Sequence, residues 1–443
     1  MRHVVVLATT ASIGLVSIFA VELVDLYFLS MLENQAIVAS LAFASAIIFF
    51  NMSFSIGLSI AMSATVAKAI GAKEDSKARS LALNNFIFST SFTTIIGLTT
   101  WVFRDDLLVI IGATGESLGY ASQYLKILLP SLPLLSLAMS GGGLVRAMGS
   151  PKLAMFAMLS GSVVNLILDP ILIFGFEMGI EGAAWASVAA RLTIGASALY
   201  LVYGKHDFAI AFSFSRFKAQ MPIILIIAVP TMATMLATPF ANAFMTVQLA
   251  DFGESYMAGW SLAGRVAPVV FGVIFALSGA IGPIYEQNFG ARKFDRVRRT
   301  LLDSIIFVVV YCLFASTIFY LSIDYVVLTF EVVGDAEKFM RFVAIWIGPS
   351  FLFYGMLFVA NAAFNNLGYP LMATAFNFGK ASIGTVPFVL YGAYIMGAKG
   401  VFLGNAVGNI FFGMASLFVC LYVINKLAAM NDGKGPAAGF RKR

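Results

Sequence analysis

Twelve long apolar runs divide this chain of 443 residues, and they restrict its fold more than any other feature. Each run is long enough to cross about 30 Å of hydrocarbon as a helix. The runs are continuous and rich in Ala, Leu, Ile, Phe and Gly, whereas the strands of a membrane barrel alternate strictly over short segments. We therefore expect an all-α integral membrane protein with helices near residues 4–32, 36–66, 81–103, 118–145, 153–176, 182–204, 222–250, 255–288, 301–323, 338–363, 370–395 and 400–427.

Composition agrees with a membrane protein. Charged residues make up 11% of the chain, against roughly 25% in soluble domains. The first apolar run is too long for a signal-peptide core and lacks an A-x-A-like exit, so we expect it to remain as a span. The two cysteines, Cys312 and Cys420, lie in apolar runs, which predicts neither a disulfide framework nor a metal site.

The cations are distributed unevenly between the two sides of the predicted membrane. Of the 28 Lys and Arg residues, 20 lie on the side of both termini and the even-numbered connections, and five lie on the other side. The remaining three, Arg191, Arg265 and Lys380, fall inside spans. The positive-inside rule therefore predicts cytoplasmic termini. The net charge of +6 reflects this topology, and we expect no nucleic-acid partner.

An internal repeat relates the two halves of the chain with an offset of 219 residues. The segment GAKEDSKARSLAL from Gly71 matches GARKFDRVRRTLL from Gly290, and RAMGSP from Arg146 matches NNLGYP from Asn365. Each copy holds six spans, so both copies run in the same direction and are related by an axis along the membrane normal. This predicts two pseudo-symmetric six-helix lobes around a central cleft, a plan typical of alternating access.

The repeat also predicts the domain boundaries. We expect an N-terminal lobe at 1–204, a cytoplasmic linker at 205–221, a C-terminal lobe at 222–427 and a basic tail at 428–443.

A pair of carboxylates lies in apolar runs of the first lobe and has no counterpart at the matching positions of the second lobe. Asp25 lies in VELVDLYFLS of the first run and Asp169 in the fifth, and at the repeat offset they correspond to Phe244 and Phe388. Intramembrane acids usually mark ion or proton pathways. The structural alternatives are a water-exposed carboxylate at the outer mouth for Asp25 and a carboxylate tied to the kink at Pro170 for Asp169.

Three neighbouring residues join these acids as candidates. Asn165 precedes Asp169 by four residues, so the two side chains share a helical face. Glu22 lies three residues before Asp25; it either shares a proton with Asp25 or only faces a wet crevice. Ser187 is a weaker candidate, because a serine in a membrane helix often bonds its own backbone.

Several motifs together resemble the multidrug and toxic compound extrusion family. They are VDLYFLS, GAKEDSKA, RAMGSPK, NLILDPILIFGFEMGIEGAAWAS, ALSGAIGPIYEQNFGARKFDRVRRTL and NAAFNNLGYP, and they cover nearly the whole chain in order. The resemblance implies an exporter that expels organic cations and other amphipathic drugs in exchange for protons or sodium. It also implies that Asp25, Asn165 and Asp169 form the proton or cation site of the first lobe, with Ser187 lining the same cavity.

The coupling ion implied by the resemblance is the proton. The segment TPFANA from Thr238 is similar to the proton-coupled bacterial branch related to DNA-damage-inducible transporters, and the run 223–250 holds no acid. Sodium held by the oxygens of Asp25, Asn165 and Asp169 is the alternative. We expect a monomer in the bacterial inner (plasma) membrane, in contact with membrane lipid and without a cofactor.

Other functions are less consistent with the sequence. A lipid or oligosaccharide-lipid flippase would share the two-lobe plan, but it would be expected to carry a cluster of cations in its cleft. A membrane enzyme would need catalytic groups, yet His3 and His206 lie near the predicted cytoplasmic surface and no HExxH motif occurs. We therefore expect a transporter.

Overall fold

The computed structural model describes residues 2–32, 35–330 and 333–431, and within these ranges the chain is helical with no β-strand. Ten of the described helical segments are long and apolar enough to span a membrane, and a pair bent by 58° at Phe271 makes an eleventh. The predicted span at 370–395 is formed by two shorter helices, α14 (Pro370–Ala381) and α15 (Val386–Met396). The all-α membrane fold predicted from the apolar runs is confirmed, with two of its spans broken.

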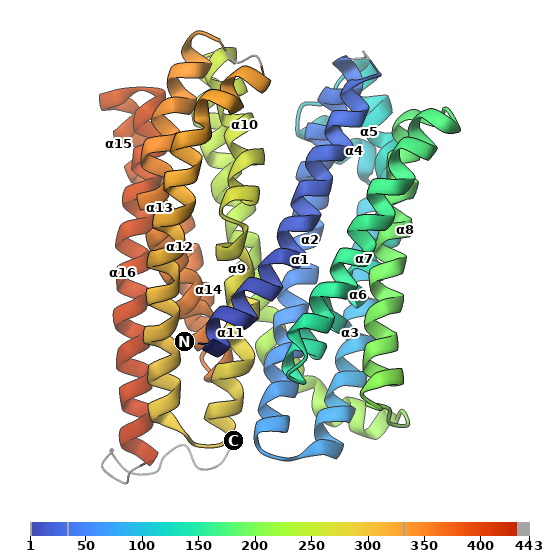
Figure 1. Ribbon diagram of the computed structural model, residues 1–443, viewed down its shortest axis with the longest axis vertical. Helices are drawn as coiled ribbons and strands as arrows, with labels where there is room; N and C mark the ends of the chain where they lie inside the picture. The colour runs from blue at the N-terminus through green and yellow to red at the C-terminus, as the bar shows by residue number, and fades with distance from the viewer. Residues whose placement is uncertain (1, 33–34, 331–332, 432–443) are drawn as a thin grey trace.

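The helices form two bundles that stand side by side (Figure 1). The first lobe contains α1 (Arg2–Ser30), α2 (Gln35–Gly71), α3 (Asp75–Val102), α4 (Arg104–Ile110), α5 (Gly115–Leu128), η1 (Leu129–Ser131), α6 (Leu132–Ala147), α7 (Pro151–Pro170), η2 (Ile171–Gly175), α8 (Gly179–Leu199) and η3 (Tyr200–Lys205). The second lobe contains α9 (Phe214–Ala250), α10 (Glu254–Val270), α11 (Gly272–Gly290), α12 (Phe294–Thr329), α13 (Asp335–Asn366), α14, α15 and α16 (Ala398–Asn431).

Helices α1 and α9, which correspond in the repeat, each cross between the lobes. Val4 and Ala8 of α1 belong to the apolar core of the second lobe. Ile224 and Ile227 of α9 belong to the core of the first lobe. Since each helix packs its first half in the opposite lobe, α1 and α9 connect the two bundles physically.

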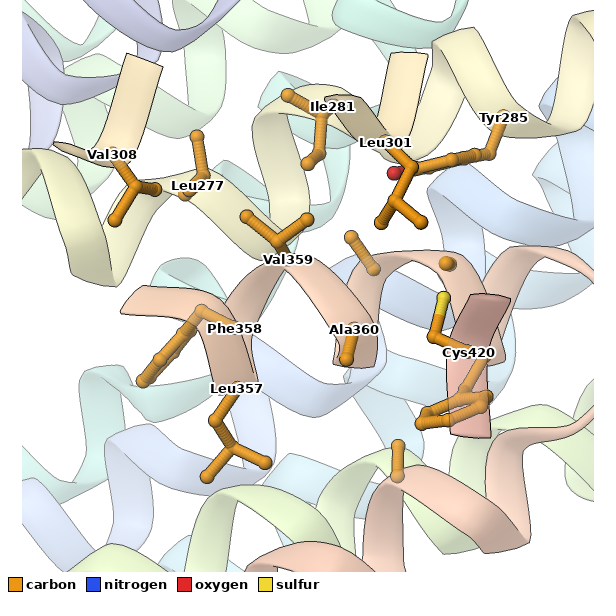
Figure 2. Packing of buried hydrophobic residues seen from close by; sticks show 14 of the residues in the cluster. Leu277, Ile281, Tyr285, Leu301, Val308, Leu357, Phe358, Val359, Ala360 and Cys420 are labelled. Carbon is orange, nitrogen blue, oxygen red and sulfur yellow. The ribbon is translucent and has the colours of Figure 1, made fainter. Parts of the chain in front are cut away.

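Residues of α11, α12, α13 and α16 form most of this core of the second lobe (Figure 2). Leu277, Ile281 and Tyr285 of α11 pack with Leu301 of α12, and Phe358 of α13 and Cys420 of α16 lie in the same cluster. Cys312 and Cys420 are free, buried thiols. Burial of these side chains away from lipid and water fixes α11 against α13.

Prolines define both ends of α7. Pro151 occupies its first turn, where a missing N–H costs nothing. Pro170 is its last residue, and the chain continues as the wider π-helical turn η2. Because proline cannot donate a backbone hydrogen bond, it loosens the helix at this point. Asp169 therefore lies in the last turn of α7, immediately before the helix changes its winding.

The predicted linker and tail are partly described. Helix α9 begins at Phe214, within the segment 205–221 that we assigned to the linker. Arg79 Nη1 donates to the Ala209 carbonyl at 3.3 Å, which attaches this segment to the end of the first lobe. Most of the predicted tail, residues 432–443, lies outside the described residues.

Candidate functional site

Asp25 of α1 and Asp169 of α7 meet in the interior of the first lobe. Their carboxyl groups are in hydrogen-bond contact. Asp25 is 8% exposed and Asp169 is fully buried. Asn165, one turn before Asp169, donates from Nδ2 to Asp169 Oδ1 at 3.1 Å. The structure therefore brings together the three residues that the sequence singled out.

The acid pair has too few donors for its oxygens. Asp25 Oδ1 and Asp169 Oδ2 are buried and have no hydrogen-bond partner. Two ionised carboxylates in contact repel each other, and burial adds a desolvation cost. A proton on one carboxyl, donated to the other, removes the repulsion and lowers the desolvation cost, because only one charge remains. A bound cation would do the same, although the described residues contain no group of three or more Asp, Glu, His or Cys side chains placed to hold a metal ion.

Glu22, one turn before Asp25, has a charged neighbour in Arg191. Its side chain is exposed and lies within electrostatic reach of Arg191 and Asp25. Arg191 Nη1 donates to Ser131 Oγ at 2.7 Å and to the Leu128 carbonyl at 3.1 Å, which anchors it on η1 and the end of α5. Arg191 thus places a fixed positive charge beside Glu22. Proton sharing between Glu22 and Asp25 stays a prediction.

Ser187 of α8 bonds the hydroxyl of Tyr124, and Tyr124 in turn lies within electrostatic reach of Asp25. Sequence reasoning identified Ser187 but missed Tyr124, and it left Arg191 without a role. Tyr124 is one of 15 tyrosines, and nothing in its neighbouring sequence distinguishes it.

The second lobe repeats the scaffold of this site but not its charges. Asn409 Nδ2 donates to Ser350 Oγ at 2.8 Å, much as Arg191 bonds Ser131. Ser350 corresponds to Ser131 at the repeat offset, and Asn409 lies one residue before the position that corresponds to Arg191. At the positions of the acid pair the second lobe has Phe244 and Phe388. The polar anchor is therefore shared by both lobes, whereas the acids belong to one.

A central cavity lies between the lobes. Its volume is about 110 Å³, and its wall is formed by helices of both bundles. Four aromatic rings and four thioether side chains dominate the wall: Phe19, Phe49, Phe275, Phe358, Met52, Met139, Met158 and Met235. The sequence alone does not identify these wall residues.

One charged side chain lines this cavity, and the sequence analysis gave it no role in the site. Arg146, in the last turn of α6, was counted among the cations of the cytoplasmic side. In the structure its side chain is largely buried and lies on the cavity wall. The signal was present in the repeat, because the corresponding residue of the second lobe is the neutral Asn365.

Contacts between the lobes involve the second half of α2 and the end of α6. Thr231 of α9 donates to the Gly57 carbonyl at 2.9 Å. Gln287 of α11 donates to the Ala147 carbonyl at 3.0 Å, and Lys68 lies 5.6 Å from the centroid of the Phe289 ring. The cavity is therefore closed toward the end where α2 and α11 finish, and the ribbons of the lobes diverge toward the other end (Figure 1).

The remaining intramembrane charges have local partners. Lys380 Nζ donates to the side-chain carbonyl of Asn405 at 2.9 Å and lies 5.3 Å from the centroid of the Tyr354 ring. Glu286 of α11, which the sequence analysis overlooked, is buried and within electrostatic reach of Lys68. The side chain of Arg265 lies outside the described part of the chain.

The fold and the repeat agree with a known family. The pattern of the MatE family matches residues 11–171 and again residues 230–390. These two matches have the same length and are separated by 219 positions, the offset found in the sequence. Together they cover more than half of the chain.

Similar proteins cover nearly the whole chain. The FAD transporter of Shewanella oneidensis is 26% identical over 425 residues, which is 94% of this chain and 92% of that protein. The multidrug export protein MepA of Staphylococcus aureus is 25% identical over 418 residues, 92% of this chain and 87% of that protein. An aspartate-to-asparagine mutant of the Vibrio cholerae MATE transporter VcmN has the same fold, with a TM-score of 0.89 at 23% identity over 96% of this chain and 97% of that one. The chain therefore belongs to the MATE family, whose members are membrane transporters and not enzymes.

Proposed function

We propose that the chain is a secondary active antiporter that exports amphipathic drugs, with the organic cations expected from the sequence among them, in exchange for protons. The observation that carries this proposal is the buried contact between Asp25 and Asp169, with an unpartnered oxygen on each carboxyl. Two buried carboxyl groups in contact are stable when they share a proton and repel each other when both are ionised. Such a pair is suited to take up and release protons during a transport cycle.

Helix α1 provides the connection between proton and substrate. It carries Asp25 of the acid pair and, six residues earlier, Phe19 of the central cavity wall. Ser17 of the same helix is hydrogen-bonded to Ser162 of α7 at 3.0 Å. A change of charge at Asp25 and Asp169 alters the packing of α1 on α7, and this displaces Phe19. Protonation of the acid pair and binding of substrate in the cavity thereby exclude each other, although the substrate does not touch the acids.

The distribution of cations supports an orientation with both termini in the cytoplasm of a bacterial cell, in the plasma membrane. In this orientation the closed end of the cavity faces the cytoplasm and the state described here is outward-facing. We propose that a monomer completes the cycle, because the acid pair and the cavity are both formed within one chain.

Cysteine labelling tests this orientation. Ser76, in the first turn of α3, and Thr114, between α4 and α5, are exposed at opposite ends of the first lobe. We expect a membrane-impermeant maleimide to label Thr114→Cys in intact cells and Ser76→Cys only in inverted vesicles. The native thiols Cys312 and Cys420 are buried, so the background is low. The opposite pattern would reverse the orientation.

Transport by the purified full chain in lipid vesicles tests the function. We expect a fluorescent amphipathic dye to accumulate inside vesicles whose interior is more acidic, with or without sodium. Accumulation driven by a sodium gradient at constant pH would replace the proton by sodium at Asp25, Asn165 and Asp169. Movement of a phosphate-headgroup lipid without movement of any dye would support the flippase alternative.

A further inference from the structure

Arg146 places a positive charge in the wall of the central cavity, and no other lining side chain is charged. The guanidinium lies between the lobes, beside two glycines. A Cβ atom on Gly142 of α6 would lie 3.4 Å from Nη1, and one on Gly279 of α11 would lie 4.0 Å from Nη2. The missing side chains at these positions leave room for the guanidinium between α6 and α11.

This charge lacks a counter-charge in the described part of the chain. Arg146 Nε is buried without a hydrogen-bond partner, and no carboxylate among the described residues acts on the guanidinium. Arg191, the other buried arginine of the first lobe, lies instead within electrostatic reach of Glu22. Since an unpaired charge away from water is costly, Arg146 is poised for an anion that the protein itself does not supply.

The hydroxyl groups of the cavity wall already have partners. Ser53 and Ser59 donate to backbone carbonyls at 2.9 and 2.7 Å, and Thr238 is hydrogen-bonded to the Tyr354 hydroxyl at 3.0 Å. The rest of the wall is aromatic, thioether or aliphatic. Arg146 is therefore the residue of this cavity wall that can recognise the charge of a ligand. The rings and methionines recognise its shape.

We propose that the central cavity binds amphipathic anions, in which a flat aromatic body packs against Phe19, Phe275 and the methionines while a phosphate or carboxylate group pairs with Arg146. A guanidinium presents a planar fork of donors that matches both kinds of anion. Aromatic rings and thioethers accept flat ligands of varied shape. A cationic cargo would instead meet an unbalanced positive charge. This inference rests on the proposed export function and narrows its substrates.

Flavins provide a matched set of probes, because FMN is riboflavin with one added phosphate group and both are fluorescent. We expect purified wild type in vesicles with an acidic interior to accumulate FMN at least about tenfold faster than riboflavin, given the strength of charge-assisted hydrogen bonds. Fluorescein, a carboxylate, tests whether the anion must be a phosphate. Ethidium, a flat cation, tests the opposite charge.

Variants of Arg146 assign the preference to this side chain. Arg146→Gln should reduce FMN accumulation about tenfold or more while riboflavin is unaffected, and Arg146→Lys should retain a part of the preference. Lys152→Gln is the matched control, because it removes an exposed cation only six residues away. Equal loss of all probes in correctly folded Arg146→Gln would assign Arg146 a structural role and overturn the proposal.

The wild-type protein alone also decides the matter if Arg146→Gln does not fold. Quenching of flavin fluorescence by the detergent-solubilised chain should show tighter binding of FMN than of riboflavin. Equal affinities, or ethidium transport without transport of any anion, would contradict the inference but leave the export function intact. Failure of every probe to follow the pH gradient would instead contradict the export function.

Discussion

Asp25→Asn is expected to abolish accumulation driven by a pH gradient, so that vesicles with this variant behave like vesicles without protein. The amide preserves the shape of the side chain and its contact with Asp169, but it cannot take up or release a proton. Passive exchange of substrate down its own gradient should persist, because the cavity wall is unchanged. The measurement is dye accumulation with acid inside, compared with dye counterflow at equal pH.

The control for Asp25→Asn is an aspartate outside the pair. Asp106 is exposed on α4, so Asp106→Asn removes a carboxylate of the same chain without touching the buried site and should transport like wild type. Wild-type accumulation in Asp25→Asn would remove Asp25 from the coupling mechanism.

Gly57→Ala is expected to stop transport by a different route. A Cβ atom at Gly57 of α2 would lie 2.6 Å from Cα and 2.7 Å from the backbone nitrogen of Met232 on α9. Backbone atoms cannot turn aside as a side chain can, so α2 and α9 must separate, and the bond from Thr231 to the Gly57 carbonyl breaks. Overpacking of this kind costs about 1–3 kcal/mol.

This cost falls on the state in which the cavity is closed next to α2 and α9. Because two transport states differ by only a few kcal/mol, such a penalty shifts their populations by about one to two powers of ten. We expect accumulation to fall accordingly, while the purified protein stays folded. Gly119→Ala on α5 is the matched control, since no atom lies within 4 Å of its Cβ position. Equal transport by both variants would show that the contact between α2 and α9 does not open during the cycle.

The fold was largely predictable because hydropathy and the repeat are properties of long segments. The break at Phe271 and the division of the span at 370–395 were not, although Pro268 lies just before the first and the glycine at position 384 lies in the second. Helices remain apolar across such breaks, so a hydropathy window cannot detect them. The crossing of α1 and α9 into opposite lobes also escaped prediction, because it depends on tertiary packing.

The site residues that could be predicted are those whose charge is unusual within a membrane-spanning segment. Asp25 and Asp169 stand out because a carboxylate is costly in an apolar run and because the second lobe has phenylalanine at both positions. Arg146 escaped because it is close to a loop, where an arginine also fits the positive-inside rule. Tyr124 and the cavity-lining rings escaped because the sequence does not tell which face of an apolar helix meets the cavity.

Proton release on substrate binding tests the central claim most directly. Purified protein in a weakly buffered detergent solution with a pH indicator receives a compound that wild type exports. If Asp25 and Asp169 hold a proton that substrate binding displaces, wild type should acidify the solution, and the double variant Asp25→Asn/Asp169→Asn should bind the compound without any release. Binding to wild type without acidification, or equal acidification by the double variant, would contradict the account.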